Sequence, residues 1–183
     1  MSARRAILAA LLAGLCAGCA TNPGSPAPSP SPRFGAPVVT APRDVSAVAE
    51  SPCASLLEPS ELHQLGFSGP GRQRTSIDVQ ECSWSNADDE DLAMAVDADR
   101  DLLADTYRTR LSRIFVPVTV AGYPAVRQRM SDDDNTCTVT TGLGPRQALE
   151  TEWSGLMTRQ TSDPCTHAEE AIALVIRKLP PQK

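Results

Sequence analysis

Residues 163–181 read DPCTHAEEAIALVIRKLPP, and this stretch predicts a helix around which the domain is built. Asp163 can cap the first turn, and Pro164 suits the first helical position because it has no N–H to leave unpaired. The apolar side chains recur at helical spacing on one side, at Ala168, Ile172, Val175 and Leu179, before Pro180 and Pro181 end the helix. A helix with one apolar face needs an apolar surface to cover, so we expect it to lie across a sheet.

Short segments upstream alternate between apolar and polar or small residues, as strands do. Residues 77–85 and 92–98 flank an acidic turn at 88–91 and predict an antiparallel hairpin. The alternation slips between Val79 and Cys82, which suggests a β-bulge. Further strands are expected at 116–120, 125–130, 137–141 and 149–153, with turns at Gly122, at 132–135 and at 142–145.

Two more helical segments are predicted. Residues 52–65 suit two short helical pieces that end at Gly66. Residues 100–113, capped by Asp99, place Leu103, Tyr107, Leu111 and Ile114 on one stripe. These patterns indicate the α+β class, as an antiparallel sheet of about five to seven strands with N-terminal, middle and C-terminal helices.

Length and charge limit the function. The chain has 183 residues, which leaves room for one domain, expected at residues 51–183. It carries 17 basic and 22 acidic residues, a net charge of −5. Phosphate backbones would repel such a surface, so nucleic acid is not an expected partner.

The first 18 residues have the layout of a secretory signal peptide. Arg4 and Arg5 precede an uncharged stretch of about ten residues, whereas a membrane-spanning helix needs about twenty. Residues 15–19, LCAGC, resemble the bacterial lipobox. That resemblance implies that Cys19 receives a diacylglyceryl thioether, becomes the mature N-terminus and anchors an exported protein to the outer face of the cytoplasmic membrane. The alternative is that Cys16 and Cys19 are small apolar residues of a leader that is cut elsewhere.

Residues 19–50 are expected to be a disordered tether. The segment holds Ala, Ser, Thr and Gly with seven prolines, at positions 23, 26, 28, 30, 32, 37 and 42. Such a composition cannot form a core. We expect a semi-rigid spacer that reaches roughly 30 to 95 Å.

Four cysteines remain beyond the leader, and in an exported chain they suggest two disulfides. Three pairings are possible, and loop entropy does not choose among them. We favour Cys53–Cys82 and Cys137–Cys165, because each would join the start of a helix to a nearby strand. Zinc is the competing interpretation, but the four cysteines contain no CxxC pair and His63 and His167 are the only histidines, so neither metal nor cofactor is expected.

An ordered set of short motifs carries a family resemblance. It comprises SPCxxLLxPxEL with LG in residues 51–66, CSW at 82–84, VxGxPA at 120–125, CxV at 137–139 and DPC at 163–165. In this order, after a lipobox and a proline-rich tether, it resembles the actinobacterial lipoproteins grouped as domain-of-unknown-function family 3558. The resemblance implies an envelope lipoprotein with an α+β domain and supplies no catalytic residue.

Several local patterns are candidates for functional sites. Residues 66–70, GFSGP, nearly match the GxSxG nucleophile elbow, but Ser68 follows a helix and Pro70 replaces the second glycine. The acidic turns at 88–91 and 132–134 could bind calcium weakly, although they lack the EF-hand glycine. The sequence also has arginines close together on the middle helix (Arg108, Arg110 and Arg113) and on a strand (Arg127 and Arg129). They suit either a solvated face or a contact with an anionic lipid or ligand.

The sequence therefore predicts a lipid-anchored envelope protein that acts as a non-enzymatic binding, sensor or accessory module, with another envelope protein as a possible partner. One alternative is a carrier that holds a lipid or small hydrophobic ligand between sheet and helix. The other is an envelope hydrolase.

Overall fold

The computed structural model describes residues 32–76, 79–155 and 163–183. Seven strands form one antiparallel sheet in the order β1-β2-β3-β7-β6-β5-β4. The strands are β1 (Arg72–Ser76), β2 (Val79–Ser85), β3 (Asp91–Asp97), β4 (Ile114–Val120), β5 (Tyr123–Arg129), β6 (Thr136–Gly144) and β7 (Gln147–Ser154).

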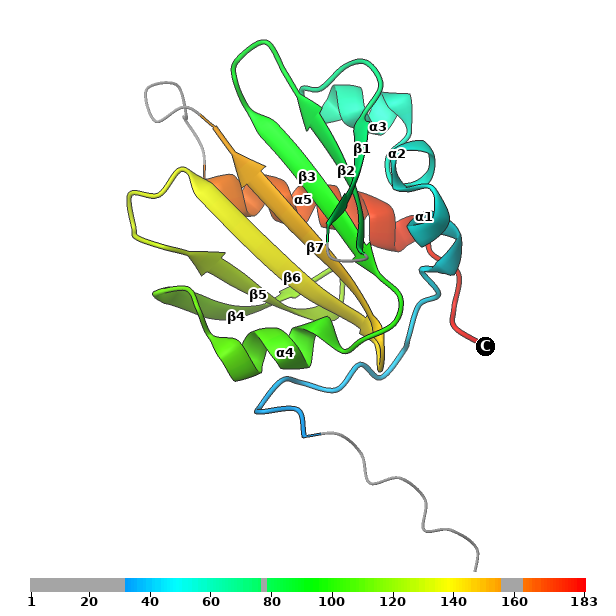
Figure 1. Cartoon of the computed structure of the whole chain (residues 1–183), viewed down its shortest axis with the longest axis vertical. Helices are drawn as coiled ribbons and strands as arrows, with labels where there is room; N and C mark the ends of the chain where they lie inside the picture. The colour runs from blue at the N-terminus through cyan, green and yellow to red at the C-terminus, as the bar shows by residue number, and fades with distance from the viewer. Residues whose placement is uncertain (1–31, 77–78, 156–162) are drawn as a thin grey trace, which may run out of the picture. The chain divides into compact units, whose positions relative to one another are not determined.

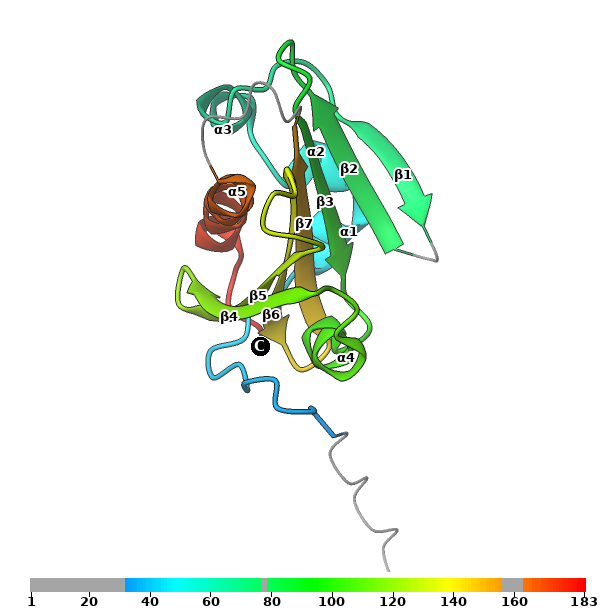
Figure 2. The ribbon, with the colours of Figure 1, turned by 90° about the vertical axis from the view of Figure 1, so that its left-hand side faces the viewer.

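The described residues also form five helices, which pack around this sheet (Figures 1 and 2). They are α1 (Ser46–Glu50), α2 (Pro52–Ser55), α3 (Pro59–Gln64), α4 (Leu102–Thr109) and α5 (Pro164–Lys178). Helix α5 crosses the face of β6 and β7, and α4 packs on the opposite face at the lower end of the sheet. The predicted α+β class, with early, middle and late helices, is confirmed.

The C-terminal helix forms as its sequence predicts. The Asp163 side chain accepts a hydrogen bond from the Cys165 N–H, and Pro164 occupies the first position. The apolar face of α5 then lies on the central strands, where Ile172 and Val175 are fully buried. Met94, Val139 and Trp153 meet them from the sheet, so large side chains fill the interior where a carried lipid would have to lie.

Two disulfides fix the short helices and α5 to the sheet. Cys53 of α2 is bonded to Cys82 of β2, and Cys137 of β6 is bonded to Cys165 of α5. The Cα atoms are 5.0 Å apart in both pairs. The favoured pairing is therefore confirmed, and each bridge joins a helix start to a strand as expected.

The middle helix is shorter than the sequence predicts. It begins after Asp101, not Asp99, because the Asp101 carboxylate accepts a hydrogen bond from the Ala104 N–H. It ends where Arg110 takes a left-handed conformation with φ 41°. Leu111, expected on the buried stripe, is 82% exposed.

Three details of the sheet differ from the prediction. Strand β1 is not predicted because its sequence, RQRTS, has no apolar residue to show alternation. The bulge expected between Val79 and Cys82 is wrong for Gln80–Ser85, which pair with β3 without a register shift. The irregularity lies instead between Gly142 and Gly144, which belong to β6 and not to the expected turn.

The ordered domain begins well before residue 51. The Arg43 side chain donates hydrogen bonds to the Tyr123 hydroxyl and to the Leu179 carbonyl, and Arg43 forms a β-bridge with Pro181. Val45 is 1% exposed within the core. Residues 33–50 are therefore packed on the domain and are not part of a disordered tether. Backbone and arginine hydrogen bonds hold them in place, although the segment has few bulky apolar side chains.

The predicted leader, Cys19 and the first part of the tether lie outside the described residues. Within the described ranges, no helix has both the length and the apolar character needed to cross a membrane.

Candidate functional site

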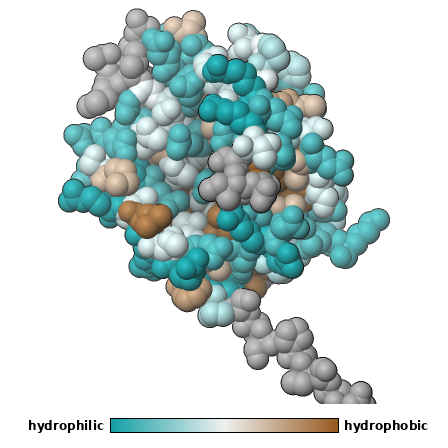
Figure 3. All heavy atoms as spheres, in the orientation of Figure 1, coloured by the Kyte–Doolittle hydropathy of each residue, from teal (hydrophilic) through white to brown (hydrophobic). Residues whose placement is uncertain are grey.

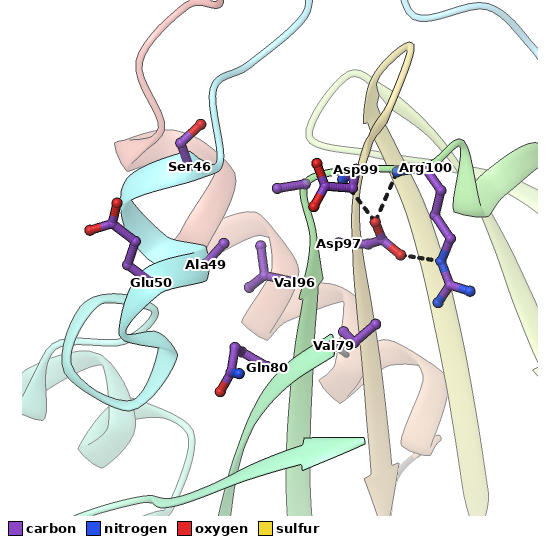
Figure 4. Close-up of a pocket in the computed structure, with 10 residues that line it drawn as sticks. Ser46, Ala49, Glu50, Val79, Gln80, Val96, Asp97, Asp99 and Arg100 are labelled. Carbon is purple, nitrogen blue, oxygen red and sulfur yellow. Dashed lines mark hydrogen bonds and ion pairs between the residues drawn. The ribbon is translucent and has the colours of Figure 1, made fainter. Parts of the chain in front are cut away.

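A pocket of about 430 Å³ lies between α1 and the ends of β2 and β3 (Figure 4). Ala49 of α1 faces Val96 across it, while Asp97 and Arg100 lie on the side away from α1. The Asp97 carboxylate accepts hydrogen bonds from the backbone N–H groups of Asp99 and Arg100, each at 3.0 Å, and forms an ion pair with the Arg100 guanidinium.

These contacts indicate a structural role for Asp97. Its side chain is 4% exposed, and its hydrogen bonds shape the turn that leads into α4. The hydrogen bond to Asp97 also raises the pKa of Arg100. The buried carboxylate therefore already has its hydrogen-bond partners within the protein and does not require a ligand.

A second pocket, here called the Trp84 pocket, has a volume of about 500 Å³, within the usual range for small-molecule sites. It lies between the α2–α3 segment and the ends of β1 and β2. Its apolar lining is Leu57, Pro59, Leu62, Phe67, Pro70 and Trp84. Cys53 also lines it, so the disulfide to Cys82 ties the helical wall to the sheet wall.

A series of aromatic contacts connects the lining of the Trp84 pocket to α5. Phe67 packs edge-on against Trp153, with ring centroids 5.1 Å apart. Trp153 in turn stacks on His167 of α5 at 4.6 Å. The pocket floor is thus fixed to the central helix through aromatic contacts, which prefer these geometries.

The indole of Trp84 is the unusual group at this pocket. Trp84 is 2% exposed, and its Nε1–H has no hydrogen-bond partner among the residues that the structure describes. The nitrogen lies against Gly71, where a Cβ atom would come within 2.7 Å of it. A buried unpaired donor costs about 1–3 kcal/mol. Because less than 1 Å² of this nitrogen is exposed, an acceptor brought by a ligand would remove the penalty only after a local shift that opens the nitrogen to the pocket.

The polar lining of the Trp84 pocket includes a serine and a histidine that the sequence alone does not place together. Ser68 and His63 are both exposed and both line the Trp84 pocket. No hydrogen bond joins them in the described structure, so Ser68 lacks the base contact that activates a nucleophile. Glu58, the nearby acid, is engaged in the capping box of α3 with Glu61.

Several of the other candidate residues have local structural partners. Arg127 forms a two-point ion pair with Glu169 of α5, and this hydrogen bonding raises the pKa of Arg127. Arg108 pairs with Asp105 at 3.2 Å. The acidic turn at 132–134 is folded by Asp134, whose carboxylate accepts from the Thr136 N–H. Within residues 32–76, 79–155 and 163–183, no three His, Cys, Asp or Glu residues are grouped so as to hold a metal.

The sheet face opposite α5 carries one perturbed carboxylate. Glu150 of β7 accepts a hydrogen bond of 2.9 Å from the Thr140 hydroxyl. Burial raises the pKa of Glu150 above its ordinary value of 4.5, and the hydrogen bond from Thr140 opposes that rise. This face is otherwise dominated by hydrophilic residues, teal in Figure 3, so Glu150 is a half-buried carboxyl group within a polar surface.

Replacing Glu150 by Gln should change the pH dependence of stability. The folded protein binds this proton more tightly than the unfolded chain, so wild-type stability falls as pH rises from 4.5 through the raised pKa. The Glu150→Gln variant has no carboxyl group to titrate at this position. Its stability relative to wild type should therefore increase as the pH rises from 4.5 through the raised pKa. Urea unfolding over a pH series measures the difference, with Glu152→Gln on the same face as the control for net charge. A difference that does not vary with pH would contradict the assignment.

Comparison with known proteins gives one match. A family model described as "Protein of unknown function (DUF3558)" matches residues 14–178. No curated protein and no solved structure matches the chain. The match thus spans the described domain, including both disulfides and the Trp84 pocket, without naming a ligand for it.

Proposed function

This chain belongs to the DUF3558 family, whose members have no assigned function, so we propose a role from its own residues. The protein is a non-enzymatic binding module of the cell envelope that holds a small, mostly apolar ligand in the Trp84 pocket. The ligand presents one hydrogen-bond acceptor, such as a carbonyl oxygen, to the Trp84 indole.

The unpaired Trp84 N–H carries this proposal. Most buried donors in folded proteins have partners. Trp153 Nε1 is also unpaired among the described residues, but only Trp84 of the two tryptophans lines the pocket. The pocket between α1 and the ends of β2 and β3 has no buried unpaired side-chain donor among the described residues. Its buried carboxylate, Asp97, accepts hydrogen bonds from Asp99 and Arg100. The apolar lining of the Trp84 pocket would bind the body of the ligand, while the indole would orient it.

Export and lipid anchoring form the second part of the proposal. The signal-like leader and the lipobox resemblance at Cys19 support a location on the outer face of the cytoplasmic membrane. The two disulfides support this placement, because such bonds persist in oxidising compartments outside the cytosol. A Cys19→Ala variant that stays in the membrane fraction would contradict the anchor.

The binding proposal differs from a lipid carrier in where the ligand sits. The space between α5 and the sheet is filled by buried residues such as Ile172 and Trp153. The Trp84 pocket lies at the edge of the sheet beside exposed Ala54 and Ser68. A ligand there can be shared with a second envelope protein or sensed without opening the core.

Isobutyramide is a suitable probe, because it joins a branched apolar group to a carbonyl acceptor. The chain has two tryptophans, so a ¹H–¹⁵N spectrum should contain two indole signals. We expect the Trp84 signal to shift and saturate with a dissociation constant on the order of millimolar, as a small fragment gives. The signal of the fully packed Trp153 should stay in place and serve as an internal reference.

Filling the pocket provides the matched comparison. Ala54 is exposed and lines the Trp84 pocket, so Ala54→Phe should abolish the saturating shift. Ala47 is exposed on α1 and does not line the pocket, so Ala47→Phe should leave it intact. An unmoved Trp84 signal in wild type, or the same shift in Ala54→Phe, would contradict the proposed site.

A further inference from the structure

The lower end of the domain in Figures 1 and 2 is where α4 and residues 33–43 lie together. Large apolar side chains are exposed there. Phe34 is 47% exposed, Val38 69% and Leu111 82%. These are three of the five large hydrophobic residues found exposed in the described chain. We call the surface formed by Phe34, Val38, Arg110, Leu111 and Arg113 the basal surface.

Positive charge accompanies these apolar side chains. Between Thr106 and Ile114 the sequence has three arginines and no acidic residue, in a chain whose net charge is −5. Arg110 lies over the Phe115 ring at 4.8 Å and over the Tyr107 ring at 5.7 Å. Arg113 is exposed, and within the described ranges neither it nor Arg110 has a carboxylate at ion-pair distance.

Two carboxylates near the basal surface already form ion pairs with other arginines. Asp101 pairs with Arg33, and Asp105 pairs with Arg108. The third, Asp99, lies on the turn before α4, and its backbone carbonyl accepts a hydrogen bond from Arg146. The arginines of the basal surface therefore remain available to an anionic partner.

The N-terminal chain enters the domain at this surface. Arg33 is bound to Asp101 at the start of α4, and Gly35 lies beside the Tyr107 ring. Only fourteen chain steps separate Cys19 from Arg33, which at 3.3–3.6 Å each is at most about 50 Å. A lipid on Cys19 would keep the basal surface within that distance of the bilayer.

We propose that the basal surface docks on the anionic phospholipid headgroups of the membrane that holds the anchor, a proposal that rests on the lipidation of Cys19. Arg110 and Arg113 contact phosphate groups, while Phe34, Val38 and Leu111 enter the interface between headgroups and acyl chains. Weak contacts suffice, because the anchor makes docking intramolecular. With its lower end on the bilayer, the domain holds the Trp84 pocket away from the membrane.

Hydrogen exchange on the full-length acylated protein tests this docking. The protein is placed in nanodiscs of phosphatidylcholine alone, or of phosphatidylcholine with phosphatidylglycerol. We expect amides in 33–39 and 106–115 to exchange roughly threefold or more slowly in the anionic discs. Each basic residue at an anionic surface contributes about a fivefold change in partition, so Arg110→Glu/Arg113→Glu should remove the difference.

Two further variants separate docking from folding. Arg113→Glu alone spares the ring contacts of Arg110 and should reduce the protection in part. Arg72→Glu/Arg74→Glu reverses two exposed arginines on β1 and should leave the protection unchanged. Equal exchange in both kinds of disc, or equal loss in the β1 variant, would overturn the proposal. The intact mass reports acylation of Cys19 separately, and if it is absent, added phosphatidylglycerol vesicles test the same surface by the same exchange.

Discussion

Reduction of the two disulfides should unfold the domain, or nearly so, under conditions where the oxidised protein is folded. Cys53–Cys82 and Cys137–Cys165 close loops with sequence separations of 29 and 28 residues. The loop-entropy relation gives each bridge about 3.5 kcal/mol. Together they approach the total stability of a typical domain, which is about 5–15 kcal/mol.

Paired substitutions separate the two bridges. Cys137→Ala/Cys165→Ala frees the start of α5 from β6, and Cys53→Ala/Cys82→Ala frees α2 from β2. Each double variant should lose about 3.5 kcal/mol in urea unfolding. The second should also loosen the Trp84 pocket, which Cys53 lines. Unchanged thermal unfolding of the wild type in the presence of reductant would contradict this account.

The Gly71→Ala substitution should cost about 3 kcal/mol or more and damage the Trp84 pocket. A Cβ atom at residue 71 would lie 2.2 Å from the Cys82 Sγ and 2.7 Å from the Trp84 Nε1. Both atoms belong to buried groups, and Sγ is fixed by its bond to Cys53, so neither can move cheaply. The added methyl group must therefore displace the chain at the start of β1.

Gly69 provides the matched control for this substitution. It is two residues away and has φ +87°, and a Cβ atom added there would meet no described atom within 4 Å. Gly69→Ala should cost only the left-handed backbone strain, about 1–2 kcal/mol. Chemical unfolding of both variants gives the comparison. A smaller loss for Gly71→Ala than for Gly69→Ala would show that residue 71 does not pack as described.

Local signals in the sequence were sufficient for much of the fold. The cap at Asp163 and the spacing of Ile172 and Val175 predicted α5, because capping and helical periodicity depend on near neighbours. The pairing of Cys53 with Cys82 followed from placing each next to a predicted helix or strand. The helix therefore depended on near neighbours, and the disulfide on the correct assignment of the elements that carry its cysteines.

Features that depend on distant contacts were not predictable. Strand β1 pairs with β2 through its backbone, which any sequence can do, so RQRTS carried no signal. Residues 33–50 looked like a tether because their partners, such as Tyr123 and Leu179, are far along the chain. Leu111 fitted a helical stripe, but the helix ended one residue earlier at Arg110.

The Trp84 pocket could not be predicted either, because its lining comes from separate parts of the chain. The sequence drew attention to Ser68 as part of a near match to a hydrolase motif, and to Trp84 as part of the CSW motif in the family resemblance. Only the fold shows that both line one pocket with His63. The close approach of Gly71 to the indole gave no signal in the sequence, because it depends on where β1 begins relative to β2.

Native mass spectrometry of the full-length protein, tagged at its C-terminus and purified from its host in mild detergent, shows whether a ligand occupies the Trp84 pocket. We expect a chain that starts at acylated Cys19 and retains a small molecule. That molecule should be present in Ala47→Phe and absent in Ala54→Phe. Wild-type protein without a retained small molecule, or the same retained mass in Ala54→Phe, would contradict a ligand in the Trp84 pocket.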